Sequence, residues 1–354
     1  MAAKRVLLLA GGQSDEHEIS LLSARNVARG LEDAGFSLAV RVIDRQGQLL
    51  GRDDSARAVA LGRADGAGAS LMTLATAVAD CDVVFPLLHG PMGEDGTIQG
   101  LLTLLGVPFV GSGVLGSALC MDKAMSKEVL AATGIGQVDY RLVQQSAFAN
   151  DPQAVEAELA ASLPLPWFVK PANLGSSVGI SKVRSAQELR PSLAAALAYD
   201  RRVIVEAGID GVRELEVAVL GNDAPEASVV GEITYQAEFY DYETKYTEGR
   251  SKMAIPADLA DDVAARLQAM AKRAFVALDC AGLARVDFFL RQRDGALFLN
   301  ELNTMPGFTA FSMYPSMWRQ AGLGYEDLLR RLVALALERA DGRPAVRTAQ
   351  PAPR

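Results

Sequence analysis

The pattern of expected secondary structure changes near residue 137, and this change most constrains the possible folds. Before it, short apolar runs typical of buried strands alternate with segments that carry apolar residues at helical spacing. Such alternation predicts a parallel sheet covered by helices. The strands are expected at residues 5–10, 38–43, 83–88 and 108–110, the helices at residues 22–34, 98–105 and about 114–133, and a loop at residues 51–70.

After residue 137, strand-like segments follow one another with fewer helices between them. This order predicts α+β domains with mainly antiparallel sheets. At about 150 residues per domain, a chain of 354 residues has room for two or three domains. The strands are expected at residues 138–143, 166–171, 178–183, 202–206, 214–220, 228–235, 283–290 and 296–302, and the helices at about 153–162, 186–199, 258–278 and 325–340.

Charge and cysteine content argue against several classes of protein. The net charge of −8 and the pI near 5.0 speak against nucleic acid as the main partner. The three cysteines are widely spaced and odd in number, which suits a reducing cytoplasm and provides no disulfide framework.

The first apolar run of the sequence is shorter than a signal-peptide core and is expected to be a strand. No stretch approaches the roughly 20 apolar residues of a membrane span, and two histidines offer no zinc cluster.

The segment WFVKPANLGSSVGISKV, residues 167–183, is typical of an anion-binding loop. Its lysine, Lys170, precedes the glycines and lies on the expected strand, so the segment matches neither the P-loop nor the dinucleotide-binding motif. Val169 and Lys170 point to opposite sides of a strand, which lets Lys170 face a cleft. Small residues would let backbone amides and the hydroxyl groups of Ser176 and Ser177 approach a phosphate. The alternative is a plain glycine- and serine-rich hairpin.

Two further segments admit both a functional and a structural interpretation. In HGPMGEDGTIQG, His89 ends an apolar strand, where α/β sheets usually bind ligands, but the segment could equally be a tight turn before a helix. In LCMDKAMSKEVL, Lys123 and Lys127 are four residues apart on an expected helix. Taken alone, that pair is more typical of a solvated helix face.

The segment ARVDFFLRQRDGALFLNELN, residues 284–303, places acidic side chains within two apolar strands. Buried carboxylates are unfavourable unless a cation or a hydrogen-bond donor compensates them. Glu301 and Asn303 are two residues apart and therefore share one face of a strand. A three-residue turn that ends at Gly295 in the left-handed conformation would put Asp287 opposite Glu301 on that face.

This hairpin predicts a magnesium site. Asp287, Glu301 and Asn303 would supply three oxygen ligands, with no histidine or cysteine nearby. Such ligands suit Mg²⁺ that holds nucleotide phosphates. The alternative is a buried salt bridge of Asp287 or Glu301 with Arg285.

Two segments are expected to lack a fixed place in a sheet or core. Residues 237–252 are polar and aromatic and connect two expected strands, and long connections of this kind are often lids. Residues 341–354 are expected to form a flexible tail.

Together these segments resemble the ATP-grasp superfamily and, within it, the D-alanine–D-alanine ligase family. The resemblance runs from Arg5 to about Arg339 and is carried, in the family's order, by GGQSDEHEIS, HGPMGEDGTIQG, GSGVLGSALCMDK, VKPANLGSSVGISKV, FYDYETKY, ARVDFFL and NELNTMPGFTAFSMYP. It implies an ATP-grasp fold of α/β and α+β domains, in which an N-terminal parallel-sheet, Rossmann-like domain precedes two domains that grip ATP. The expected domains are residues 1–121, 122–212 and 213–340, with the tail at 341–354.

The resemblance also implies site residues. Those expected to bind ATP are Lys123, Lys170, Ser177, Glu206, Glu214 and Lys245, with the two glutamates at adenine and ribose. Those expected at the substrates and reacting groups are Glu16, His89, Ser176, Tyr246, Arg285, Gly307, Ser312 and Met313. The expected ligands of two Mg²⁺ ions, for which Mn²⁺ can substitute, are Asp287, Glu301 and Asn303.

Among these, Glu16 would hold the ammonium of the first D-alanine, linked to Ser176 and Tyr246, with His89 nearby. Arg285 and the Gly307 amide would stabilise the tetrahedral intermediate, and Ser312 and Met313 would hold the second D-alanine. In one departure from the family, this chain has Ala207 where many relatives carry a lysine after the adenine-contacting glutamate.

The reaction implied is ATP-dependent ligation of two D-alanines through an acylphosphate, for peptidoglycan precursors and hence cell wall biogenesis and cell shape. The resemblance alone implies a homodimer through the first domain, and the cysteine content favours the cytoplasm. Three alternatives stay open: a D-alanine–D-lactate ligase, another ATP-grasp carboxylate–amine ligase, and a nucleotide-binding module without catalysis. Intact Arg285, Glu301, Asn303 and Lys245 argue against the last.

Overall fold

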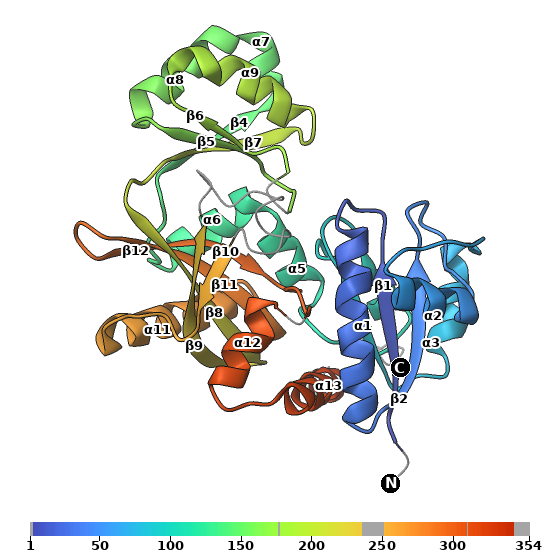
Figure 1. The fold of residues 1–354 in the computed structure, drawn as a ribbon. Coiled ribbons are helices and arrows are strands. Elements are labelled where there is room, and N and C mark those ends of the chain that lie inside the picture. Colours follow the sequence, from blue (N-terminus) through green and yellow to red (C-terminus); the bar gives the residue numbers. More distant parts are fainter. Residues whose placement is uncertain (1–2, 176–177, 236–250, 310, 343–354) are drawn as a thin grey trace, which may run out of the picture.

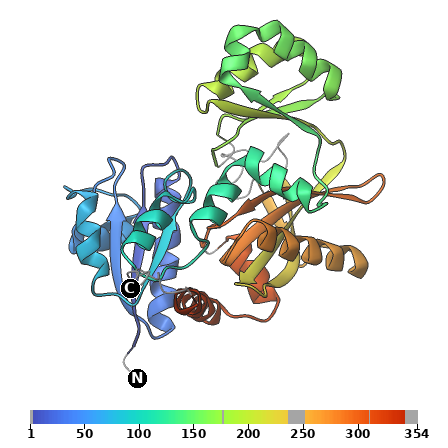
Figure 2. The same ribbon diagram turned by 180° about the vertical axis from the view of Figure 1, so that it is seen from behind.

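The computed structural model describes residues 3–175, 178–235, 251–309 and 311–342. Residues 237–250 of the expected lid and residues 343–354 of the expected tail lie outside these ranges. The described chain forms three sheets with helices packed on them, shown from two sides in Figures 1 and 2. The expected change from a parallel sheet to antiparallel sheets is confirmed.

The first sheet is parallel, with strand order β2-β1-β3. β1 and β3 are apolar runs because both of their faces are covered, whereas β2 is partly exposed. Helices α1, α2 and α13 pack on one face, and α3 and α4 on the other. The elements of this part are β1 (Arg5–Gly11), α1 (His17–Asp33), β2 (Ser37–Ile43), α2 (Arg52–Leu61), a 3₁₀ turn (Leu71–Thr73), α3 (Leu74–Val78), β3 (Val83–Leu88), α4 (Thr97–Leu104) and α5 (Val114–Met121).

The loop expected at residues 51–70 was wrong, because helix α2 occupies its first half. Alanine recurs along this segment and favours helix. Asp53 and Asp54 lie in the first turn, where negative charge interacts favourably with the helix dipole. Gly62 follows in the left-handed conformation and ends the helix.

The single helix expected at residues 114–133 was also wrong, because Asp122 breaks it into α5 and α6. Asp122 has an extended backbone, and its side chain accepts a hydrogen bond from Met125 N at 3.0 Å, so it caps α6. The strand expected at residues 108–110 is a single bridge between Phe109 and β3.

The second sheet is antiparallel, with strand order β4-β7-β5-β6. Helices α7, α8 and α9 contribute to the core on its outer face, and its other face looks toward the rest of the molecule (Figure 1). The elements of this part are α6 (Lys123–Ala132), β4 (Tyr140–Gln144), α7 (Gln145–Asn150), α8 (Pro152–Ser162), β5 (Trp167–Pro171), β6 (Ser181–Val183), α9 (Ala186–Leu197) and β7 (Arg202–Ala207).

The third sheet is antiparallel, with strand order β10-β9-β8-β11-β12. Helix α11 packs on one face, and α12 packs on β8 and β9. The short elements α3, α7, β10 and α12 have no counterpart among the expected ones. The elements of this part are β8 (Val212–Gly221), β9 (Glu226–Tyr235), β10 (Ser251–Ala254), α11 (Asp261–Ala277), β11 (Gly282–Arg291), β12 (Ala296–Asn303), α12 (Met313–Gln320) and α13 (Tyr325–Asp341).

The β11–β12 hairpin pairs Asp287 with Glu301, as expected, but by a different route. Its loop has four residues rather than three, because Arg291 pairs with Ala296. The pairing then shifts by one at a bulge, where Asn300 is skipped. Gly295 has φ +68°, the left-handed conformation expected of it.

Helix α13 lies at the end of the described chain and contacts elements at its beginning. It packs against α1, and both helices belong to the core that covers the first sheet (Figures 1 and 2). Gly30 on α1 allows this close approach, since a Cβ there would lie 2.6 Å from side-chain atoms of Tyr325 and Leu329. The first and third sheets are therefore held together by a continuous core.

Candidate active site

A cavity of about 700 Å³ is lined by residues of the second and third sheets and, from the N-terminal part, by residues of α1 and of the loops before it and after β3. Such volumes are typical of small-molecule sites. Every expected site residue that the structure describes lines this cavity. These residues are Glu16, His89, Lys123, Lys170, Glu206, Glu214, Arg285, Asp287, Glu301, Asn303, Gly307, Ser312 and Met313. Four further expected residues, Ser176, Ser177, Lys245 and Tyr246, lie outside the described residues.

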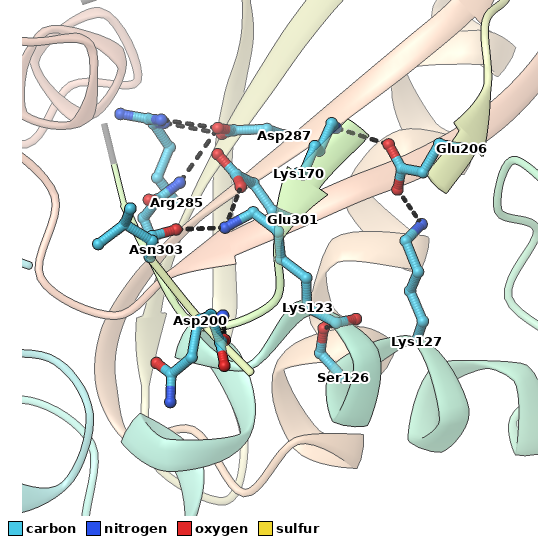
Figure 3. Close-up of polar contacts among 12 residues, drawn as sticks. Lys123, Ser126, Lys127, Lys170, Asp200, Glu206, Arg285, Asp287, Glu301 and Asn303 are labelled. Atoms are coloured by element: carbon cyan, nitrogen blue, oxygen red, sulfur yellow. Dashed lines mark hydrogen bonds and ion pairs between the residues drawn. The ribbon is translucent and has the colours of Figure 1, made fainter. Parts of the chain in front are cut away.

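Strands β11 and β12 present a charged network to the cavity (Figure 3). Arg285 donates to both carboxylate oxygens of Asp287, at 2.7 and 2.6 Å, and its Nε lies 3.1 Å from Glu216. Asn303 Nδ2 donates to Asp287 at 3.1 Å. Burial lowers the pKa of Arg285, but Asp287 and Glu216 outweigh it and raise this pKa well above its usual value. The guanidinium therefore stays charged.

The bulge at Asn300 is what turns Glu301 toward the cavity. Residues alternate between two faces along a strand, and a shift by one residue exchanges the faces. Before the bulge, Leu297 and Leu299 are buried in the core; after it, Leu302 is buried and Glu301 lines the cavity. Glu301 therefore joins Asp287 on one face.

Lys123 approaches Glu301 from the start of α6. Its ammonium lies 3.9 Å from the Glu301 carboxylate and donates to Leu174 O at 2.5 Å. Leu174 precedes the glycine- and serine-rich segment. The contact therefore links α6, the loop after β5, and β12 at one point of the cavity.

Beneath the second sheet, Glu206 is held between two lysines (Figure 3). Its carboxylate oxygens lie 2.8 Å from Lys127 Nζ and 2.5 Å from Lys170 Nζ. Burial raises the pKa of Glu206, but the two ammonium groups outweigh burial and lower this pKa to about 2. The solvated helix face considered for Lys123 and Lys127 was wrong, because the Lys127 side chain is only 2% exposed.

The N-terminal rim of the cavity carries Glu16 and the turn after β3. Gly90, with φ +74°, brings backbone close to Glu16; a Cβ there would lie 2.8 Å from Glu16 Oε2. His89 Nδ1 lies 3.0 Å from Met305 O, and His89 is buried. Burial lowers the pKa of His89, so its imidazole is neutral at pH 7.

The loop between β12 and α12 forms the adjoining wall. Ser312 Oγ accepts a hydrogen bond from Thr309 N at 2.9 Å, which closes the loop just before α12 begins at Met313. A Cβ on Gly307 would lie 2.9 Å from Ser312 Oγ. Gly307 therefore lets Ser312 approach the backbone closely.

The donor set on β11 and β12 fits a magnesium ion that is shared with phosphates. Asp287, Glu301 and Asn303 offer two carboxylates and one amide on one cavity face, and Mg²⁺ is commonly held by one or two carboxylates plus phosphate oxygens. In the described part of the chain, no three acidic, histidine or cysteine side chains gather as a metal site by themselves. The salt bridge considered as an alternative is present as well, between Arg285 and Asp287.

Sequence reasoning missed two features of the cavity wall. Glu94 lines the cavity and accepts hydrogen bonds from Gly90 N and Met305 N; removal from water, followed by the charge of Glu16, raises its pKa to about 8. Cys120 also lines the cavity, and its thiol lies 3.4 Å from that of Cys280. The one local hint of Glu94 was the presence of an acidic residue in the turn after β3. No local pattern predicts that Cys120 lies beside Cys280.

Comparison with known proteins gives a consistent result. Residues 5–112 match the family model for the D-ala D-ala ligase N-terminus, and residues 129–334 match that for the D-ala D-ala ligase C-terminus. A D-alanine–D-alanine ligase of Deinococcus radiodurans is 57% identical over 336 residues, which cover 95% of this chain and 99% of that protein.

Two solved structures share the fold along nearly the whole chain. The D-alanine–D-alanine ligase from Coxiella burnetii has a TM-score of 0.79 and 35% identity, over 96% of each chain. The VanG D-Ala:D-Ser ligase from Enterococcus faecalis has a TM-score of 0.82 and 34% identity, over 94% of this chain and 99% of that one. Among the described residues, no helix is long and apolar enough to cross a membrane.

Proposed function

This chain belongs to the D-alanine–D-alanine ligase family, and on that premise we propose that it joins two D-alanines into D-alanyl-D-alanine at the expense of ATP. The product would enter peptidoglycan precursor synthesis, and thereby cell wall biogenesis and cell shape. The observation that carries the proposal is the shared face of Asp287 and Glu301, which lies in one cavity with Lys123, Lys170 and Arg285. That combination suits a nucleoside triphosphate beside a reacting carboxylate.

The lysines would bind the phosphates. Lys123 and Lys170 line the cavity from α6 and β5. Burial lowers the pKa of Lys170, but Glu206 outweighs burial and raises this pKa, so its ammonium is charged at neutral pH. Because the Glu206 carboxylate is engaged by two lysines, we infer that Glu206 meets adenine through its backbone, with Glu214 at the ribose. Ser177 and Lys245 would complete the phosphate contacts.

Asp287, Glu301 and Asn303 would hold two Mg²⁺ ions, or Mn²⁺ in their place. When bound, these ions would neutralise phosphate charge that develops during transfer. Asn303 would present its Oδ1 atom, which requires its amide to turn from the orientation in which Nδ2 donates to Asp287.

In the first step, a carboxylate oxygen of one D-alanine attacks the γ-phosphorus of ATP, and ADP leaves. Glu16, linked to Ser176 and Tyr246, would hold the substrate ammonium, with His89 nearby. Arg285 would lie against the reacting carboxylate and favour the charge of the acylphosphate. The step converts a poor electrophile into one with a phosphate leaving group.

In the second step, the amine of another D-alanine attacks the acyl carbon, loses a proton and displaces phosphate. Ser312 and Met313 would hold the carboxylate of this second substrate. Arg285 and the Gly307 amide would stabilise the tetrahedral intermediate. Positioning and charge neutralisation carry the reaction, and no enzyme nucleophile is needed.

We further infer domains at residues 1–121, 122–212 and 213–340, with a tail at 341–354. The junction of α5 and α6 at Asp122 and the start of β8 at Val212 support the two internal boundaries. We also propose a cytoplasmic homodimer, as the family resemblance implies. The free state of all three cysteines is consistent with a reducing compartment.

Purified protein with ATP, Mg²⁺ and a panel of D- and L-amino acids, D-serine and D-lactate tests the function. Phosphate release should require D-alanine, and mass spectrometry should identify D-alanyl-D-alanine as the main product. A main product that contains D-serine or D-lactate would indicate a ligase with a different second substrate. ATP binding without phosphate release would indicate a module without catalysis.

A further inference from the structure

Two residues of the turn after β3 hold the backbone of Met305 from both sides. Glu94 accepts a hydrogen bond from Met305 N at 3.2 Å, across 211 positions of the chain. His89 Nδ1 lies 3.0 Å from Met305 O, across 216 positions. Nδ1 carries the proton in this contact, because a carbonyl oxygen only accepts. The amide and the carbonyl of one residue are thus both fixed by another domain.

The second oxygen of Glu94 fixes the turn itself. It accepts a hydrogen bond from Gly90 N at 2.7 Å. A single carboxyl group therefore uses both oxygens, one within its own turn and one on the distant loop. Neighbouring Asp95 is different, since within the described parts of the chain it accepts only from Met92 N at 2.8 Å and Thr97 N at 3.0 Å, both close in sequence.

Met305 lies midway between two groups that the proposed reaction needs. Asn303, two residues before it, faces the cavity at the end of β12, and Gly307 lies two residues after it. Pro306 restricts the backbone between Met305 and Gly307. A displacement of Met305 would therefore be transmitted in both directions over a short stretch of chain.

We propose that Glu94 is a positioning residue that, with His89, clamps Met305 and thereby aligns Asn303 and the Gly307 amide. This rests on the function proposed above. Glu94 acts through backbone hydrogen bonds, so its effect should fall on the rate of ligation more than on nucleotide affinity. Gln at this position is the informative change, because both oxygens of a carboxyl group can accept, whereas an amide has one accepting oxygen and must point its NH₂ group at a backbone N–H.

The test compares Glu94→Gln, Asp95→Asn and the wild-type chain. A buried N–H without an acceptor costs about 1–3 kcal/mol, which corresponds to a roughly five- to hundredfold loss. We expect kcat of Glu94→Gln to fall by about that factor, with the KM for ATP within about twofold of wild type. Amide exchange of residues 303–308 should become at least about tenfold faster. Asp95→Asn should keep kcat and exchange near wild type.

The outcomes separate the clamp from the proposed function. Equal kcat and equal exchange in Glu94→Gln and Asp95→Asn would overturn the clamp. Dipeptide synthesis by the wild type is a separate result; if it is absent, the proposed function fails, and the exchange measurement alone decides the clamp. If Glu94→Gln does not fold, Glu94→Asp replaces it, since its side chain is one methylene shorter and cannot hold Gly90 N and Met305 N at once. Unchanged exchange at 303–308 in that variant would likewise overturn the clamp.

Discussion

Asp287 and Glu301 face each other across β11 and β12 only because Asn300 is left out of the pairing between the strands. Without that bulge, Asp287 would lie opposite Asn300, and Glu301 would point into the apolar core beside α11. Bulges next to sites often aim a side chain in this way. The pairing of two carboxylates on one face is thus a property of the strand's register.

Deletion of Asn300 should remove the bulge and still retain most activity. Leu299 and Glu301 would become successive residues of a regular strand, so Glu301 would stay opposite Asp287 on the cavity face and Leu302 in the core. Asn300→Ala keeps the residue count and should retain most activity. Thermal unfolding and dipeptide synthesis check both variants; a deletion variant that folds but is inactive would show that the extra residue itself is needed to shape the site.

Glu301→Gln should leave the fold intact and abolish turnover. The amide keeps the shape of the side chain and removes the charge that a magnesium ion shared with ATP would need. Circular dichroism and phosphate release at saturating Mg²⁺ measure the two effects. Near-native activity would remove Glu301 from the proposed ligands.

Lys127→Met should lower the free energy of unfolding at pH 7 by about 3 kcal/mol, because it leaves Glu206 buried with one cation fewer. The pKa of Glu206 is lowered from its usual 4.5 to about 2, so its stabilising contribution is present above pH 4.5 and is lost as the pH falls toward 2. In Lys127→Met, the free energy of unfolding should depend less on pH over this range. Urea unfolding between pH 2 and 7 measures that dependence.

Lys272→Met is the matched control for this prediction, since Lys272 is exposed on α11. It should change the free energy of unfolding by less than about 0.5 kcal/mol. An equal loss in both variants would mean that the Glu206–Lys127 pair contributes nothing of its own.

Gly90→Ala should weaken D-alanine binding. The new methyl group would lie 2.8 Å from Glu16 Oε2, at a backbone φ of +74°. We expect the KM for D-alanine to rise by about tenfold, from strain and displacement of about 1–3 kcal/mol, with the KM for ATP unchanged. Gly106→Ala is the control, because φ there is +68° and its Cβ would meet nothing within 4 Å. A similar KM in both variants would exclude the contact with Glu16.

The local pattern of the sequence was sufficient to predict most helices and strands of the fold. The strands at Val83–Leu88 and Ala296–Asn303 and the helix at Tyr325–Asp341 were predicted within about one residue, because hydrophobic periodicity is set by neighbours in the chain. It failed at residues 51–70, where alanine and a glycine cap outweighed polar composition. It failed again at Asp122, whose side chain caps one helix and ends another.

The sequence by itself determined most of the secondary structure and indicated many residues of the cavity, since hydrophobic periodicity and motifs such as ARVDFFL and NELN depend on residues close together in the chain, but it missed Glu94 and Cys120. Only the tertiary structure decided how those groups are charged and held. Lys127 is typical of a solvated helix face until β7 brings Glu206 to within 2.8 Å of its ammonium. Glu94 gains its second hydrogen bond from a residue 211 positions away. Burial and pairing of charges depend on groups that meet only after folding, and local spacing carries no record of them.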